Sequence, residues 1–177
     1  MKKTIFAVLV CLVFTGLMLL AEETTPTPVV KEVEACWYAY MEFSGPYSDM
    51  QKGINTFMTE FFGQGLIPGG PALCLYFNSP ETVKPEELKW TFGFVVSPEA
   101  APKEPVKKME MKKQLALVYL HKGPYDNLPK SYEIAFKFIK DNGYKITGPV
   151  CDRYLNNPME VIPGGLETEI VIPVDKK

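Results

Sequence analysis

Apolar residues recur along the chain with two different periods. Segments 35–43 and 114–121 are dense in aromatic, β-branched and aliphatic residues, which predicts strands. These patterns are followed by predicted amphipathic helices that end near Gly63 and Gly143, where a left-handed residue would close a helix. The helices are indicated by apolar residues with the spacing of one helix face, at Ile54, Phe57, Met58, Phe61 and Phe62 and again at Ile134, Ala135, Phe138 and Ile139.

Two shorter apolar segments follow each predicted helix. Residues 72–77 and 90–96 come after the first helix, and residues 150–155 and 168–174 come after the second. Each segment has the composition of a strand, and loops rich in turn-forming residues separate the members of each pair. We therefore expect the same β-α-β-β succession twice.

The chain repeats itself at a single offset. Gly45-Pro46-Tyr47 recurs 78 positions later as Gly123-Pro124-Tyr125, after the first strand of each unit. Proline suits the entry to a helix because its φ is preset and it has no N–H to lose. The same offset relates further pairs in one order without a gap: Gly70 and Gly148, Pro71 and Pro149, Tyr76 and Tyr154, Asn78 and Asn156, Pro80 and Pro158, Leu88 and Leu166. This ordered set indicates an internal duplication.

These elements predict an α+β fold built from a duplicated β-α-β-β unit, residues 33–96 and 114–175, with pseudo-twofold symmetry. Residues 97–113, rich in Pro, Lys and Glu, are interpreted as a solvated linker between the units, and residues 22–32, which contain Thr-Pro-Thr-Pro, as a spacer. The helix of each unit covers only one face of its sheet. The two units can therefore leave a ligand groove between them, on the side that the helices do not fill.

The N-terminus has the layout of a secretory signal. Lys2 and Lys3 precede an almost wholly apolar run, residues 5–20, which Glu22 and Glu23 end abruptly. We expect residues 1–21 to be a signal peptide and the folded part to be exported, whether periplasmic, secreted or membrane-anchored. Retention of the run as an uncleaved anchor is the alternative, and only then would a membrane be a partner.

Charge and composition exclude several classes of function. The formal net charge is -2, without the basic excess that nucleic acid binding needs, so nucleic acid is not an expected partner. No phosphate-binding loop, dinucleotide fingerprint or G-x-S-x-G motif occurs, and no cofactor is expected. His121 is the only histidine, and Cys36, Cys74 and Cys151 form no C-x-x-C pair, so no metal site is expected. Whether two of these cysteines pair is left open.

Several motifs resemble one known family. They are Leu120-His121-Lys122-Gly123-Pro124-Tyr125, then Gly148-Pro149, then Leu166-Glu167-Thr168-Glu169-Ile170 with Ile172-Pro173-Val174. This ordered set is similar to the GyrI-like, effector-binding domain family, which includes the ligand-sensing part of AraC-type and multidrug-responsive regulators. The resemblance covers residues 33–175 as one domain. It implies a duplicated fold with an aromatic pocket between the copies and a buried glutamate near the end of the second copy. Residues 1–32 are expected to be signal and spacer, without room for a helix-turn-helix, so transcriptional regulation is not carried over from the resemblance.

Five side chains are the candidates for ligand binding. Glu169 matches the family's buried glutamate, and strand alternation places it on the face opposite Ile170. Trp90, Tyr40, Tyr76 and Tyr154 are the candidate aromatic lining, since such rings can stack on a flat or cationic ligand. Ordinary core packing of these aromatics, and a solvent-facing Glu169, are the alternatives.

The function expected from these features is small-molecule binding, with an aromatic, cationic or hydrophobic ligand and no catalysis. Two alternatives stay open. The resemblance also implies that the domain could hydrolyse reactive cyclopropane-type toxins, with Glu169 as the catalytic residue that directs water. A structural or partner-binding role in the cell envelope is the third hypothesis.

Overall fold

The computed structural model describes residues 26–176, so the predicted signal peptide lies outside the described residues. None of the helices in this range is long and apolar enough to span a membrane. The helices and strands are β1 Val29–Val33, β2 Cys36–Ser44, α1 Met50–Gly63, β3 Ala72–Tyr76, β4 Lys89–Val96, β5 Lys107–Met111, β6 Gln114–Lys122, α2 Leu128–Asp141, β7 Tyr144–Ile146, β8 Val150–Tyr154 and β9 Glu167–Lys176. Short 3-10 turns, η1 Tyr47–Asp49 and η3 Tyr125–Asn127, lead into the two helices.

Both predicted units are confirmed. The first is β2-α1-β3-β4 and the second is β6-α2-β8-β9, with helix and strand assignments that agree with the sequence patterns. Three further strands were not predicted: β1, β5 and the short β7, which pairs with β9. β1 lies partly in the segment interpreted as a spacer, and β5 lies in the segment interpreted as a solvated linker. Both β1 and β5 contain charged residues, because one face of a strand at the edge of a sheet can stay in water. Their sequences therefore lack the apolar pattern by which a strand is recognised.

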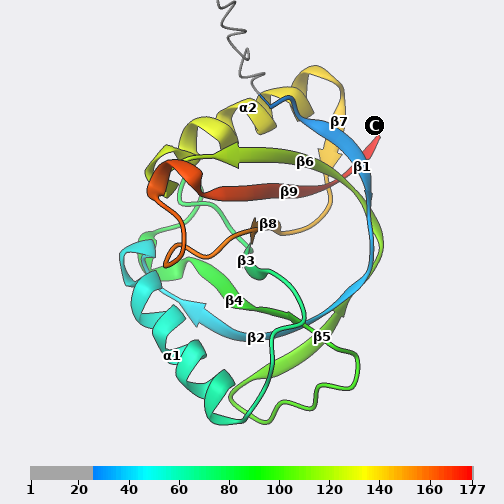
Figure 1. The fold of residues 1–177 in the computed structure, drawn as a ribbon. Coiled ribbons are helices and arrows are strands. Elements are labelled where there is room, and N and C mark those ends of the chain that lie inside the picture. Colours follow the sequence, from blue (N-terminus) through cyan, green and yellow to red (C-terminus); the bar gives the residue numbers. More distant parts are fainter. Residues whose placement is uncertain (1–25, 177) are drawn as a thin grey trace, which may run out of the picture.

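One curled antiparallel sheet contains both units (Figure 1). Its strand order is β1-β6-β9-β8-β3-β4-β2-β5, with β7 added beside β9. The units meet where β3 pairs with β8, and there Cys74 lies opposite Asp152, its own equivalent 78 positions later. This order and register are those that a pseudo-twofold axis between β3 and β8 would produce.

The edge strands are exchanged between the units. β1 precedes the first unit in sequence yet pairs with β6 of the second, and β5 precedes the second unit yet pairs with β2 of the first. Consequently the segments that join β1 to β2 and β5 to β6 run together, with Val33 opposite Gln114 and Cys36 opposite Met111. Figure 1 shows these two segments crossing the open side of the sheet, away from β3 and β8. We call residues 31–36 and 111–114 the two straps.

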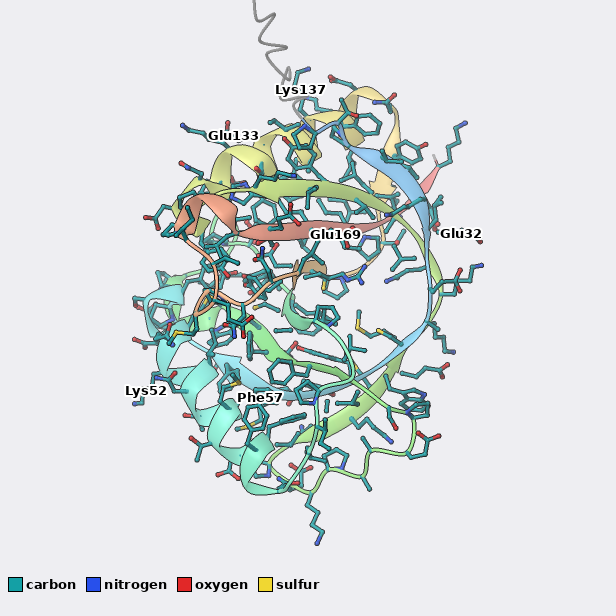
Figure 2. The ribbon with its side chains drawn as sticks, viewed as in Figure 1. Glu32, Lys52, Phe57, Glu133, Lys137 and Glu169 are labelled. Atoms are coloured by element: carbon teal, nitrogen blue, oxygen red, sulfur yellow. The ribbon has the colours of Figure 1, made fainter. Side chains whose placement is uncertain are left out.

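Each helix covers its own unit on one face of the sheet. α1 contributes Phe57 and Phe61 to a core shared with Trp90 and Phe92, while α2 packs Ala135 and Ile139 against β6 and β9. Figure 2 shows Phe57 pointing inward and Lys52 of the same helix pointing outward. Phe57 and Phe61 have no exposed surface, and burying each such ring stabilises the fold by roughly 1.5–3 kcal/mol.

The two helices end in equivalent ways, although one predicted position was wrong. Gly143 has φ of +70°, as expected for a left-handed residue after a helix. In the first unit the left-handed residue is Gly65, at φ +71°, and not Gly63, which is the last residue of α1. Gly65 and Gly143 are 78 positions apart, so the repeat would have corrected the assignment.

Candidate functional site

The central strands β3 and β8 present two different faces. Alternate side chains point to opposite sides of a strand. Cys74 and Tyr76 of β3 therefore lie on the helix side, together with Asp152 and Tyr154 of β8. The intervening residues belong to a separate apolar cluster on the far side of the sheet, Leu73, Leu75 and Cys151.

A buried carboxyl group lies at the centre of the helix side. Asp152 is only 1% exposed. Its Oδ1 accepts a hydrogen bond of 2.6 Å from the Tyr132 hydroxyl of α2, and its Oδ2 accepts one of 3.2 Å from the Tyr76 hydroxyl. Among residues 26–176, Asp152 takes part in no salt bridge, so its charge is offset only by neutral donors.

Two equivalent tyrosine pairs flank Asp152. Tyr47 packs edge-on against Tyr76 with ring centroids 5.5 Å apart, and Tyr125 packs edge-on against Tyr154 at 5.6 Å. Both pairs join the Gly-Pro-Tyr turn of a unit to its second strand, and the offset of 78 relates one pair to the other. All four rings are half-buried. We call these four tyrosines, with Tyr132 and Asp152, the tyrosine–aspartate cluster.

The environment raises the pKa values within the cluster. Burial raises the pKa of Asp152 to about 6, against the hydrogen bonds from Tyr132 and Tyr76, which lower it. Burial, followed by the charge of Asp152, raises the pKa of Tyr132 well above its usual range. The tyrosines therefore remain protonated donors, and Asp152 becomes an enclosed anion as the pH rises above about 6. Such an arrangement suits a cation that stacks on aromatic rings.

The five predicted site residues do not form one site. Tyr76 and Tyr154 belong to the tyrosine–aspartate cluster. Trp90 is on the same side of the sheet but is 2% exposed and stacks on Phe43 at 4.4 Å, so it is part of the core beside α1. Tyr40 and Glu169 are elsewhere.

Tyr40 and Glu169 both lie on the side away from the helices. Tyr40 stacks on Tyr38 at 5.0 Å. Glu169 is opposite Arg153 in the sheet, and its Oε2 is 2.9 Å from Arg153 Nη1, while its Oε1 is 3.9 Å from Lys31 Nζ. The role of Glu169 as the ligand carboxylate stays a prediction.

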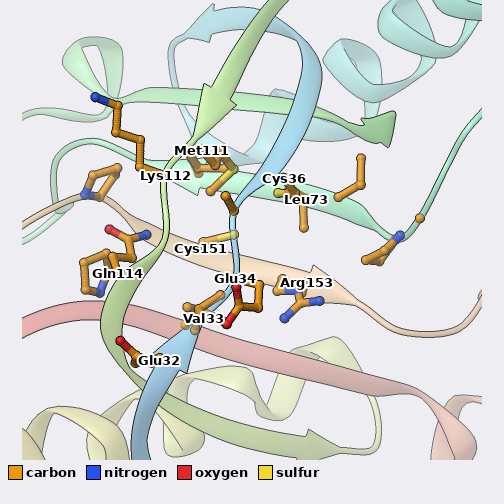
Figure 3. A pocket seen from close by; sticks show the side chains of 18 of the residues that line it. Glu32, Val33, Glu34, Cys36, Leu73, Met111, Lys112, Gln114, Cys151 and Arg153 are labelled. Atoms are coloured by element: carbon orange, nitrogen blue, oxygen red, sulfur yellow. The ribbon is translucent and has the colours of Figure 1, made fainter. Parts of the chain in front are cut away.

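The expected groove between the units is present on that same side. A hollow of about 480 Å³ lies between the sheet and the two straps, lined by residues of both units (Figure 3). Arg153 and Cys151 of β8 line it from the sheet, and Cys36 lines it from a strap. Glu169 is not among the lining residues, although it pairs with Arg153, which is one of them.

Gly93 of β4 leaves no room for a ligand, because another strand lies directly against it. A Cβ at this position would lie 2.0 Å from the carbonyl oxygen of Ala39. The neighbouring strand β2 therefore occupies the space, since Tyr40 is opposite Gly93 in the register. Gly93 is required by strand pairing.

The sequence patterns missed Asp152, Tyr132 and the two turn tyrosines. Tyr47 and Tyr125 were interpreted only as parts of a turn. Comparison of the repeats contained a signal for Asp152, because its equivalent in the first unit is the buried, apolar Cys74. A carboxylate that replaces a core residue in the middle of a strand is costly unless it has a role or partners.

The similarity to known proteins agrees with this architecture. A family model described as GyrI-like small molecule binding domain matches residues 26–175. The chain belongs to this family. Membership establishes it as a small-molecule binding domain, consistent with the resemblance noted in its motifs. None of the curated proteins compared with the chain matches it.

Solved structures of low sequence identity share the fold. The EcmrR C-terminal domain has a TM-score of 0.76 at 23% identity, covering 86% of this chain and 99% of that one. In an EcmrR–DNA complex the match covers 86% of this chain and 58% of EcmrR. A conserved protein from Listeria innocua has a TM-score of 0.65 at 14% identity, and the match covers 85% of this chain and 93% of that one. SAV2435, solved bound to tetraphenylphosphonium, has a TM-score of 0.57 at 12% identity, and the match covers 84% of this chain and 93% of that one.

Proposed function

We propose that this domain binds lipophilic aromatic cations at the tyrosine–aspartate cluster. The observation that carries the proposal is the burial of Asp152 among tyrosines, without a salt bridge to any cationic side chain of residues 26–176. A buried carboxylate loses its hydration, and neutral hydrogen bonds replace only part of it. A bound cation would supply the missing charge, and the tyrosine rings would supply stacking and cation–π contacts.

Entry of a ligand requires the tyrosines to move. Because Asp152 is 1% exposed, the rings of Tyr76 and Tyr154 must part before a cation reaches its carboxyl group. Their edge-on contacts with Tyr47 and Tyr125 are made near the surface by half-buried side chains, which can change rotamer without unfolding the core. SAV2435, which shares the fold, was solved with a ligand of this cationic and aromatic type.

The test compares two ligands of the same shape. Methyltriphenylphosphonium is cationic, and triphenylphosphine oxide is its neutral counterpart. We expect Asp152→Asn to weaken phosphonium binding by about tenfold or more, equivalent to 1.4 kcal/mol, and to leave phosphine oxide binding unchanged. Isothermal titration calorimetry at pH 7.5 measures both affinities.

Glu169→Gln is the matched control. It removes a carboxylate on the opposite side of the sheet, so phosphonium affinity should be unchanged if Asp152 selects the cation. A loss in Glu169→Gln without a loss in Asp152→Asn would instead support the expectation from the family motif. Equal losses for both ligands in Asp152→Asn would contradict charge selection. The hydrolytic alternative predicts product beyond one equivalent when the protein is incubated with an electrophilic ligand.

The proposal includes export of the domain, on the strength of residues 1–21. The N-terminal sequence of the protein purified from its native cells tests this directly. A chain that begins at Glu22, recovered outside the cytoplasm, is the expected result. A chain that retains residues 1–21 in the membrane fraction would support an uncleaved anchor, and a cytoplasmic chain would contradict export.

A further inference from the structure

The groove on the side away from the helices has an apolar floor. Its central part is formed by side chains of four neighbouring strands: Leu73 and Leu75 of β3, Val95 of β4, Cys151 of β8 and Val171 of β9. The two straps form the opposite wall, with Cys36 and Met111 among the lining residues (Figure 3). The volume of about 480 Å³ is within the range of small-molecule sites.

One end of this floor carries positive charge. Arg153, the only arginine of the chain, lines the groove with its side chain 32% exposed. Its Nη1 pairs with Glu169, which Lys31 also approaches at 3.9 Å. The three groups together therefore carry a net charge of one positive unit, from two cations and one carboxylate.

Counted together with Lys113, the other charged lining residues, Glu32, Glu34 and Lys112, add no net charge. Glu32 and Glu34 of the first strap point largely into solvent, with side chains 67% and 78% exposed. Both pair with Lys113, at 3.0 Å and 3.1 Å. Lys112 of the second strap adds a further cation at the rim.

We infer that the groove is a second ligand site, which takes amphipathic molecules with a single carboxylate. The carboxylate binds the guanidinium nitrogens of Arg153 that Glu169 does not occupy, with Lys31 beside it. Guanidinium groups match carboxylates in geometry as well as charge. The hydrocarbon part lies along the floor of β3, β8 and β9, and the straps move apart to admit it, because Leu73, Leu75 and Val171 are only 1–3% exposed beneath them. An anion neutralises the net charge of this end, whereas a cation increases it.

This site is independent of the tyrosine–aspartate cluster. Asp152 and Arg153 are consecutive residues of β8, so their side chains point to opposite sides of the sheet. The two sites are therefore expected to select opposite charges. A variant that abolishes binding at one site should leave binding at the other unchanged. Phosphonium binding tests the proposed function and carboxylate binding tests the second site, so either proposal can fail without the other.

The experiment titrates dodecanoate and dodecyltrimethylammonium, below their micelle concentrations, into the protein. We expect saturable dodecanoate binding that shifts the methyl NMR signals of Leu73, Leu75 and Val171. Affinity should rise about fourfold per methylene from octanoate to dodecanoate, because each buried methylene contributes hydrophobic free energy. Arg153→Gln should weaken dodecanoate binding at least tenfold, and Asp152→Asn should leave it unchanged.

The double variant Arg153→Gln with Glu169→Gln guards against a folding defect, since it removes both members of the ion pair. It should melt near the wild-type temperature, bind methyltriphenylphosphonium like the wild type, and still lose dodecanoate. The inference is overturned if dodecanoate binds this variant as tightly as the wild type. Equal affinity for dodecyltrimethylammonium at the same methyl groups, or no dodecanoate binding to the wild type, overturns it as well.

Discussion

At the residue scale, a buried carboxyl group is present in one unit and absent from the other. Asp152 replaces the apolar Cys74 of the first unit, and Tyr132, which donates to it, replaces Ile54. Within residues 26–176 the duplicated framework therefore holds two equivalent tyrosine pairs but one buried acid. In the proposed function this asymmetry gives the cluster one charge, and we expect the buried acid to affect stability.

The stability of the domain should fall as Asp152 ionises. Its pKa is raised from 3.8 to about 6 in the folded state, so the folded state binds more protons between these pH values. The resulting contribution to the free energy of unfolding is fully present below pH 3.8 and is lost as the pH rises through about 6. At 1.36 kcal/mol per pKa unit, it amounts to about 3 kcal/mol.

Urea unfolding of the wild type and of Asp152→Asn from pH 4 to pH 7.5 measures this effect. The variant cannot titrate at this position. Its free energy of unfolding minus that of the wild type should therefore increase as the pH rises. Other carboxylates affect both proteins alike and cancel in the difference. If this difference in the free energy of unfolding is constant from pH 4 to pH 7.5, ionisation of Asp152 does not destabilise the folded domain.

At the scale of elements, the two helices approach the sheet through different pairs of residues. In the first unit, Gly53 of α1 lies against the stacked rings of Phe43 and Trp90. The equivalent position in α2 is the buried Ser131, which donates to Nδ1 of His121 at 2.8 Å. His121 donates through Nε2 to the carbonyl oxygen of Pro124, so this histidine links α2, β6 and the turn before the helix.

Substitution of Gly53 by alanine should destabilise the protein, although alanine favours helices. Its Cβ would lie 2.5 Å from Cη2 of Trp90 and 3.1 Å from Phe43, so the stacked rings must shift. We expect the free energy of unfolding to fall by about 1–3 kcal/mol through overpacking. Gly63→Ala, in the same helix with no atom within 4 Å of the new Cβ, is the control and should be neutral or stabilising. Equal effects of the two substitutions in chemical denaturation would contradict this account of the contact.

At the scale of the whole molecule, the exchange of β1 and β5 ties the units together. Each unit receives its edge strand from the segment that precedes the other, and β3 pairs with β8 across the junction. The straps that result also form one wall of the groove. Neither unit can therefore be completed by its own residues.

Residues 26–113 and 114–176, prepared separately, should each fail to unfold cooperatively. The second fragment would lack both β1 and β3 and so expose β6 and β8 as open edges. Mixing the two fragments should restore a cooperative transition and dispersed amide NMR signals, because the cut lies between β5 and β6 and removes no strand pairing. A fragment that is folded by itself would show that the exchange is dispensable.

Much of this architecture could be predicted from the chain. Periodicity identified both helices and the six strands of the two units, because these elements have clear apolar faces. It missed the three-residue β7, and also β1 and β5, whose sequences VVKEV and KKMEM are highly charged. Of the site, Tyr76 and Tyr154 were predicted through the repeat, but Asp152 was not, since a carboxylate in a strand has the same pattern whether it faces solvent or a helix.

The sequence by itself determined the duplication, the element types and the alternation of side chains, all of which depend on neighbours a few residues away. Only the tertiary structure decided which face of each strand the helices cover, and hence that Asp152 is enclosed while Glu169 pairs with Arg153. It also decided that the edge strands cross between units. These outcomes depend on contacts between residues tens of positions apart. A local sequence pattern does not indicate which face of a strand a helix will cover, or which strand will pair with it.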